Sequence, residues 1–393
     1  MVIILRDYQL EALMSWFRAQ RKGIIELPTG TGKTYIGMKV MEYYYLKGKN
    51  VCIIVPTEVL MKQWKEKILK HTQVKSYDVG FLYGKEKQIK RVTIAIINTA
   101  VKFLHILRNH FDLFILDEVH HYYAPVWFKL INAIYPEKDI LGLTATHERA
   151  DRRHEKSPLP IVYSKTYAYM QNRGYVAPIK VEVVRVPLTF EERMIYEELE
   201  EKIRQLKNKI DNLPYEVSKE DYEREYERLH RQLMILINKR KQLCSEAVNK
   251  LPVIYEIVKR ELEENPNSKI LVFTESIRTV IQIRDYLEKH GIKCGVVHSK
   301  VKHRDVVLNM WKRGIFNVLL TVRVLDEGID VPECNVGIIV SNSLTRRQLV
   351  QRIGRIVRPR PNKVAKIYIV TATATFEERI ARLIREVIYK TYY

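Results

Sequence analysis

A glycine-containing loop from Leu27 to Thr34 separates a short apolar run, Gly23 to Glu26, from a helical pattern through Ile36, Met38 and Val40. Glycines let a backbone curl so that its N–H groups and the start of the following helix point at phosphate oxygens. A phosphate-binding loop requires a strand before it and a helix after it, and both are predicted here. A Gly/Thr turn before a helix is the alternative.

The loop carries the side chains that this chemistry needs. Lys33 can reach the β- and γ-phosphates of a nucleotide, and the hydroxyl of Thr34 can hold Mg²⁺. The general formula G-x-x-x-x-G-K-[ST] would place glycine at position 27, where this chain has Leu27. We expect the nucleotide to contact Thr29, Gly30, Thr31, Gly32, Lys33 and Thr34.

The charge balance predicts a polyanionic partner. The chain has 393 residues and a formal charge of +21, from 67 Lys and Arg against 46 Asp and Glu. Nucleic acid is the first candidate for this partner and an anionic membrane surface the second. The alternative is a basic soluble protein that has no polyanionic partner. Its length suggests two to three domains, and 46% hydrophobic with 29% charged residues is typical of a soluble globular protein.

The sequence also predicts the cellular compartment, because it has no membrane span, no signal peptide and no C-x-x-C pair. No apolar run approaches the ~18 residues of a membrane span, and Arg6-Asp7 ends the apolar N-terminus before a signal-peptide core forms. The four cysteines are far apart with no C-x-x-C pair, which favours a reduced intracellular protein without structural zinc. We therefore expect a cytoplasmic protein.

Strand and helix patterns alternate along both halves of the chain. Continuous apolar runs such as Val51 to Val55 indicate strands buried on both faces, and helical patterns separate them. We predict an α/β fold with two parallel-sheet domains, residues 1–180 and 181–393. A capping box at Thr189 and Glu192 opens a helical hairpin at about 189–250, inserted after an outer strand, Val181 to Val186. Two roles remain possible for this hairpin: it could be a plain spacer, or it could bind nucleic acid.

Two further clusters carry candidate chemistry. Asp117 and Glu118 directly follow the apolar run Leu113 to Leu116, so Asp117 is predicted to hold Mg²⁺ and Glu118 to accept a proton from the attacking water. Arg355 and Arg358 share one helix face. As arginine fingers they would contribute ~10³–10⁵ in rate; a basic surface helix is the alternative.

Seven motifs follow one another along the chain: RDYQ, LPTGTGKT, VPTEVL, DEVH, LTAT, LDEGIDVP and QRIGRIVRP. Their order resembles that of superfamily 2 helicases with two RecA-like domains, and the DEVH and QRIGRIVRP strings are most similar to archaeal members of the XPB family. The resemblance covers nearly the whole chain. It implies ATP and Mg²⁺ as cofactors, DNA as partner, a thumb-like hairpin, and an archaeal or other prokaryotic source.

The resemblance also implies roles for individual residues. Gln9 would read adenine with support from Arg6, and Thr144 and Thr146 would couple the nucleotide state to domain movement. In the second domain, Asp326, Gly328 and Asp330 would line the cleft, and Gln351 would lie by the γ-phosphate with Arg355 and Arg358 as fingers. The nucleic-acid backbone would approach Pro56, Thr57, Asn98, Thr99, Thr274 and Thr321.

The chain departs from the family pattern at three places. His147 stands where the family usually has proline, so we expect the exit from the LTAT motif to differ. The charged segment His147 to Lys156 does not closely match the family. Because RDYQ begins at residue 6, we expect no N-terminal damage-recognition module.

The predicted function is an ATP-dependent DNA helicase or translocase, with a role in repair or transcription and a nuclease or a repair or transcription protein as partner. Two alternatives stay open. One is an RNA helicase or a duplex translocase that never separates strands. The other is a nucleic-acid-binding scaffold whose ATPase acts as a switch.

Overall fold

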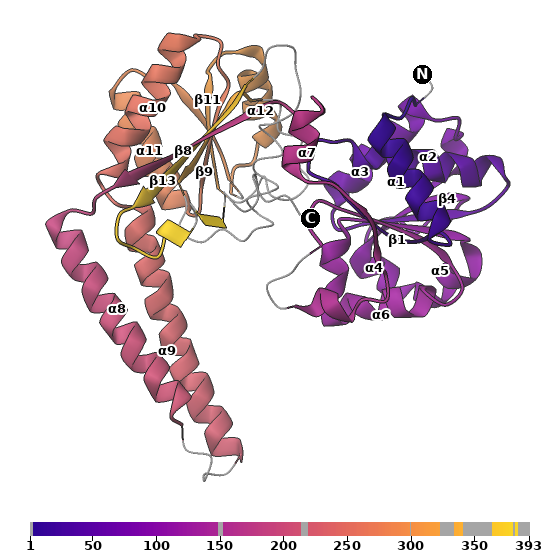
Figure 1. Ribbon diagram of the computed structural model, residues 1–393, viewed down its shortest axis with the longest axis horizontal. Helices are drawn as coiled ribbons and strands as arrows, with labels where there is room; N and C mark the ends of the chain where they lie inside the picture. Colours follow the sequence, from indigo (N-terminus) through magenta and orange to yellow (C-terminus); the bar gives the residue numbers. More distant parts are fainter. Residues whose placement is uncertain are drawn as a thin grey trace.

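The protein forms two α/β units, each built on a parallel sheet, and a long helical hairpin that extends from the second unit (Figure 1). The computed structural model describes residues 3–147, 152–213, 219–298, 300–322, 334–340, 364–379 and 382–383. Within these ranges no helix is both long and apolar enough to cross a membrane.

The first sheet has seven parallel strands in the order β3-β4-β2-β5-β6-β1-β7. They are β1 (Lys22–Glu26), β2 (Val51–Val55), β3 (Val79–Leu82), β4 (Val92–Ile96), β5 (Leu113–Asp117), β6 (Asp139–Thr144) and β7 (Ile161–Ser164). Strand β6 lies between β1 and β5, so the ends of these three strands are neighbours at the carboxyl edge of the sheet.

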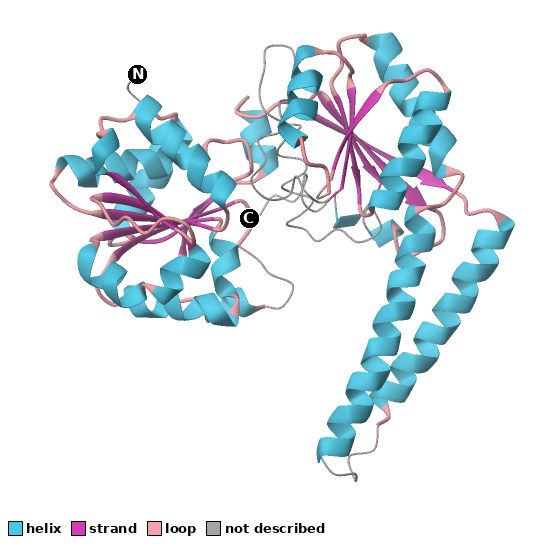
Figure 2. Ribbon diagram, turned by 180° about the vertical axis from the view of Figure 1, so that it is seen from behind, coloured by secondary structure: helices cyan, strands magenta, loops and turns pink. Residues whose placement is uncertain are grey.

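Alternate residues of the central strands pack against helices on opposite faces. Ile25 and Ile53 belong to the apolar cluster that contains residues of α1 (Asp7–Arg18), α2 (Lys33–Leu46) and α3 (Glu58–His71). Their neighbours Ile24 and Ile54 belong to the cluster with α4 (Ile97–Lys102), α5 (Leu104–His110) and α6 (Pro125–Ile134). The predicted sheet covered on both faces is confirmed (Figure 2).

The second sheet has six parallel strands in the order β10-β11-β9-β12-β13-β8. They are β8 (Ile179–Val186), β9 (Ile270–Thr274), β10 (Cys294–Val297), β11 (Val318–Val322), β12 (Val336–Val340) and β13 (Ala365–Ala372). Helices α10 (Lys250–Glu264) and α11 (Ile277–Lys289) contribute to one apolar cluster, and α12 (Arg304–Arg313) to the other. Strand β8 is the outer strand, as predicted.

The hairpin consists of α8 (Phe190–Asp211) and α9 (Lys219–Ser245), which pack against each other and project from the second unit (Figure 1). The predicted capping box opens α8: Glu192 N donates to Thr189 Oγ1 (3.2 Å), and Thr189 N donates to Glu192 Oε2 (2.9 Å). Because only narrow stripes such as Ile203, Leu229 and Leu233 are buried, most of the hairpin surface is polar and exposed.

Candidate active site

The predicted phosphate loop joins β1 to α2 at the carboxyl edge of the first sheet. Gly30 and Gly32 have φ angles of 87° and 80°, a left-handed conformation that other residues rarely adopt. Gly32 is the N-cap of α2, so the free N–H groups of that helix face the loop. The geometry is that of an anion site at the start of a 14-residue helix.

Lys33 is positioned by the same loop. Its Nζ donates to the carbonyl oxygen of Leu27 at 2.8 Å. Burial lowers the pKa of the Lys33 ammonium, whereas the nearby carboxylates of Glu118, Asp117 and Glu26 favour its charged form. Leu27, where the general formula has glycine, has a fully buried side chain and contributes its carbonyl to this contact.

Gln9 ties the first helix to the loop. Its Oε1 accepts from Arg6 N (2.9 Å), and its Nε2 donates to the carbonyls of Thr31 (3.1 Å) and Gly32 (3.3 Å). Tyr8 is also buried, and its hydroxyl donates to Thr31 O at 2.5 Å. Gln9 and Arg6 therefore lie beside the phosphate loop, and recognition of adenine by Gln9 stays a prediction.

Asp117 is the last residue of β5 and Glu118 follows it, beside the end of the neighbouring strand β6. Asp117 is buried, and its Oδ2 accepts from Trp64 Nε1 at 2.7 Å. Burial raises the pKa of Asp117, while the Trp64 hydrogen bond and the charge of Lys33 oppose that rise. Glu118 has a φ of 50°, which turns the chain sharply after the strand.

A chain of contacts connects Glu118 to the LTAT motif. His120 Nδ1 lies 3.4 Å from Glu118 Oε2 and 3.0 Å from Thr144 Oγ1. The Thr144 hydroxyl donates to the carbonyl of Thr146 at 2.7 Å. The structure thus brings together the candidate base and the two threonines. Their coupling to domain movement stays a prediction.

His147 makes a contact that a proline at this position could not make. Its backbone N donates to Glu26 Oε1 at 2.8 Å, and its Nδ1 lies 2.9 Å from the Tyr123 hydroxyl. The second oxygen of Glu26 accepts from Ser164 Oγ at 3.1 Å. The exit from the LTAT motif is therefore tied to the last residue of β1, directly before the phosphate loop.

Replacing His147 by proline is expected to lower the free energy of unfolding by about 1.5–3 kcal/mol, because a hydrogen bond to a charged group is lost. A His147→Ala variant loses the ring but keeps the N–H, so the difference between the two variants isolates the Glu26 contact. Urea unfolding measures both. Equal losses in the two variants would show that the N–H contributes nothing.

The predicted nucleic-acid contacts are placed at strand and helix ends. Pro56 directly precedes Thr57, which is the N-cap of α3. Asn98 and Thr99 are neighbours in α4, and Asn98 Oδ1 accepts a hydrogen bond from Trp127 Nε1 at 2.9 Å. Thr274 ends β9 and Thr321 lies on β11 beside it; both side chains are fully buried, and Thr274 Oγ1 donates to Thr321 O at 3.2 Å. Their roles as strand contacts stay predictions.

Six predicted residues of the second half lie outside the described ranges: Asp326, Gly328, Asp330, Gln351, Arg355 and Arg358. Conversely, sequence reasoning missed Trp64, Glu26 and His120 as parts of the site. Trp64 and Glu26 carry no local signal, because their partners are 53 and 121 residues away. His120 belongs to the DEVH motif, and membership of that motif could have indicated that His120 is part of the site.

Two family models match the chain. The model described as "Type III restriction enzyme, res subunit" matches residues 2–149, and "Helicase conserved C-terminal domain" matches residues 249–360. The helicase domain of Hef from Pyrococcus furiosus has a similar structure, with a TM-score of 0.63 and 21% identity, covering 97% of this chain and 98% of that one. This likeness confirms the predicted fold of two RecA-like domains.

Relatives named as XPB proteins match nearly the whole chain. "DNA 3'-5' translocase XPB2" of Sulfurisphaera tokodaii is 32% identical over 98% of this chain and 85% of its own length. "DNA 3'-5' helicase XPB" of Mycobacterium tuberculosis is 28% identical over 93% of this chain, which spans 60% of that protein. With the motifs in order and the phosphate loop beside the Asp117-Glu118 pair, the chain belongs to the XPB family of superfamily 2 helicases.

Proposed function

We propose that the chain is an ATP-dependent DNA helicase or translocase. The observation that carries this proposal is the juxtaposition, at one sheet edge, of the Lys33 loop with Asp117 and Glu118. A relative named as a DNA translocase aligns with 98% of the chain, which supports DNA as the substrate. The charge of +21 suits a polyanion and predicts binding that weakens steeply with salt.

The chemistry follows from the positions of the side chains. The N–H groups of the loop and the start of α2 hold the phosphates, and Lys33 leaves the Leu27 carbonyl to pair with them. Glu118 takes a proton from the attacking water. The hydroxyl of Thr34 and the carboxylate of Asp117 are hard oxygen donors of the kind that Mg²⁺ accepts, and the ion, when bound, would neutralise phosphate charge.

The second unit completes the motor in this proposal. Residues 1–180 hold ATP, and residues 181–393 close over it, with Asp326, Gly328 and Asp330 in the cleft and Gln351, Arg355 and Arg358 at the γ-phosphate. Closure and reopening change the grip of each unit on the strand, so hydrolysis is converted into steps. The family resemblance supports repair or transcription as the pathway, with a nuclease or a repair or transcription protein as partner.

The test is ATPase activity with three nucleic acids at equal nucleotide concentration. We expect both single-stranded and duplex DNA to stimulate hydrolysis. The predicted protein contacts are to the DNA backbone, which both forms present, and a translocase that never separates strands would still be stimulated by duplex DNA. Steady-state phosphate release measures the effect. Stimulation by RNA alone would contradict the DNA assignment and favour the RNA helicase.

A displacement assay separates a motor from a nucleotide-switched scaffold. Wild type should remove a blocking strand or streptavidin from DNA when ATP is present, and Lys33→Ala should not, because its loop has lost the cation for the phosphates. A scaffold would show nucleotide-dependent affinity without displacement. Equal displacement by both proteins would remove the phosphate loop from the mechanism.

A further inference from the structure

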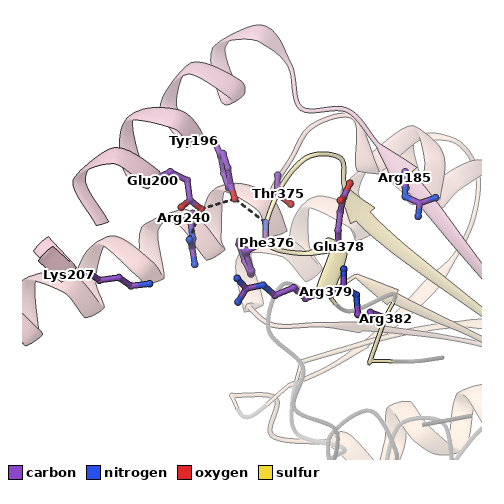
Figure 3. Close-up of a pocket in the computed structure, with 10 residues that line it drawn as sticks. All are labelled: Arg185, Tyr196, Glu200, Lys207, Arg240, Thr375, Phe376, Glu378, Arg379 and Arg382. Atoms are coloured by element: carbon purple, nitrogen blue, oxygen red, sulfur yellow. Dashed lines mark hydrogen bonds and ion pairs between the residues drawn. The ribbon is translucent and has the colours of Figure 1, made fainter. Parts of the chain in front are cut away.

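A hollow of about 630 Å³ lies at the root of the helical hairpin, between the hairpin and the outer strands of the second sheet (Figure 3). Its lining comes from four places: α8, α9, β8 and the segment after β13. The lining residues are Arg185, Tyr196, Glu200, Lys207, Arg240, Thr375, Phe376, Glu378, Arg379 and Arg382. Five are basic and two acidic, so the hollow is positively charged.

One wall of the hollow is fixed by a network of contacts. The Tyr196 hydroxyl donates to Glu200 Oε1 (2.8 Å) and accepts from Phe376 N (3.0 Å). Arg240 Nη1 donates to the same Glu200 oxygen (2.5 Å), and its guanidinium lies 4.5 Å from the centre of the Phe376 ring. The wall therefore needs no ordering when a ligand arrives, which lowers the entropic cost of binding.

Arg240 is a fixed part of this wall. Its side chain is only 14% exposed, and its ion pair with Glu200 and its contact with the Phe376 ring hold it in place.

The other basic residues of the hollow have no side-chain partner in the part of the chain that the structure describes. Within the described ranges, the side chains of Arg185, Lys207, Arg379 and Arg382 form no ion pair or hydrogen bond. Elsewhere on the hairpin the pattern differs, because several basic side chains pair with a glutamate three or four residues away: Lys202 with Glu198, Arg204 with Glu201, and Arg228 with Glu225. The hollow thus gathers positive charge that the fold leaves uncompensated.

The carboxylates of the lining cancel only part of this charge. Glu200 is engaged by Arg240 and Tyr196, whereas Glu378 accepts a hydrogen bond from the neutral backbone N of Ala374 at 3.0 Å and keeps its charge. Four basic groups and one carboxylate therefore remain, and the hollow keeps a net positive charge for an anion. The several phosphates of a polymer backbone match these separated basic side chains better than a single small anion does.

The hollow lies on the edge of the sheet where the predicted strand contacts also lie. All six strands are parallel, so the end of β8 near Arg185 and the segment after β13 share the carboxyl edge with Thr274. Strand β8 is three positions from β9 in the sheet, which corresponds to about 14 Å at ~4.8 Å per strand. A few nucleotides of a single strand are long enough to cover that distance.

We propose that the hollow at the hairpin root binds backbone phosphates of the DNA strand after it crosses the carboxyl edge of the second sheet. The proposal rests on the proposed DNA function and adds a second place of contact, at which the hairpin acts as a grip and not as a spacer. Arg240 fixes the wall through Glu200 and Phe376, and Arg185, Lys207, Arg379 and Arg382 neutralise phosphates beside it.

The experiment measures binding of a (dT)20 oligonucleotide over a series of salt concentrations, with the nucleotide site saturated by a non-hydrolysable ATP analogue. Two double variants remove charges from the hollow: Lys207→Gln with Arg379→Gln, and Arg185→Gln with Arg382→Gln. The matched control, Arg231→Gln with Lys239→Gln, removes two exposed charges from α9 outside the hollow. Thermal unfolding confirms that each variant is folded.

Each hollow variant should lower the salt slope by about 1.4 and weaken binding by about 25-fold at 0.1 M salt, since a single-strand phosphate contact contributes a slope of ~0.7. The control should stay close to wild type. Equal behaviour of the hollow variants and the control would overturn the site.

Two further outcomes are separable. If (dT)20 and duplex DNA neither bind wild type in a salt-dependent way nor stimulate its ATPase, the proposed function itself fails. Sodium tripolyphosphate, titrated under the same conditions, tests free polyphosphate as the ligand. Loss of tripolyphosphate binding in the hollow variants with an unchanged (dT)20 slope would overturn DNA as the source of the phosphates.

Discussion

Replacing Glu118 by glutamine is expected to slow ATP hydrolysis by about 10²–10⁴-fold and to leave ATP binding intact. Glutamine has the size of glutamate but cannot take a proton from water. The proposed mechanism gives that task to Glu118, which directly follows Asp117 at the end of β5 and has a φ of 50° that turns the chain there. The loop and Lys33, which are proposed to hold the phosphates, are not altered.

Single-turnover hydrolysis and binding of a fluorescent ATP analogue measure the two effects separately. Glu137→Gln is the matched control, because it makes the same chemical change at an exposed carboxylate that pairs with Arg108 in the same unit. It should behave like wild type. Weak ATP binding by Glu118→Gln with a normal rate of hydrolysis for the bound ATP would make Glu118 a binding residue and not the base.

Much of the fold was predictable because buried parallel strands leave a strong local signal. Val51 to Val55 is apolar throughout, and all five residues are buried in β2. The helix start at Thr189 was equally clear, since an N-cap threonine satisfies free N–H groups within its own first turn. Signals of this kind depend only on neighbours in sequence, and the structure confirms them.

Elements without such a signal were missed. Strand β7 is partly exposed along its length; its first residue, Ile161, is 44% exposed. The sequence of this strand therefore differs little from that of a loop. Strand β3 has four residues and forms the outer edge of its sheet. In the site, the contacts of Trp64 with Asp117 and of His147 with Glu26 depend on how β1, β5 and β6 are ordered in the sheet, which no local pattern encodes.

Lys250→Met is expected to destabilise the second unit by about 3–5 kcal/mol, because it leaves a buried carboxylate without its counter-charge. Lys250 begins α10, directly after the hairpin, and its Nζ lies 2.8 Å from Glu377 Oε2. The two side chains are 1% and 0% exposed. Glu377 Oε2 also accepts from Ala372 N at 2.7 Å, so the pair ties the hairpin root to the end of β13.

The midpoint and slope of urea unfolding measure the loss. Lys259→Met is the control on the same helix: its ion pair with Glu263 is 4.0 Å long and exposed, and its removal should cost at most about 1 kcal/mol. In the double variant Lys250→Met with Glu377→Gln, no charge is left unpaired and the amide oxygen can still accept from Ala372 N, so most of the stability should return. A double variant as unstable as Lys250→Met would show that packing of the lysine, and not the charge, is responsible.

The pH dependence gives the same prediction a definite sign. Burial raises the pKa of Glu377 above its ordinary value of 4.5, and the charge of Lys250 opposes that rise. Without Lys250 the pKa of Glu377 in the folded state rises further, so the folded variant binds this proton more tightly than the unfolded chain does. The variant's deficit should therefore be full above the folded pKa of Glu377 and should shrink as the pH falls toward 4.5. A deficit independent of pH between 7 and about 4.5 would contradict an unpaired carboxylate as its cause.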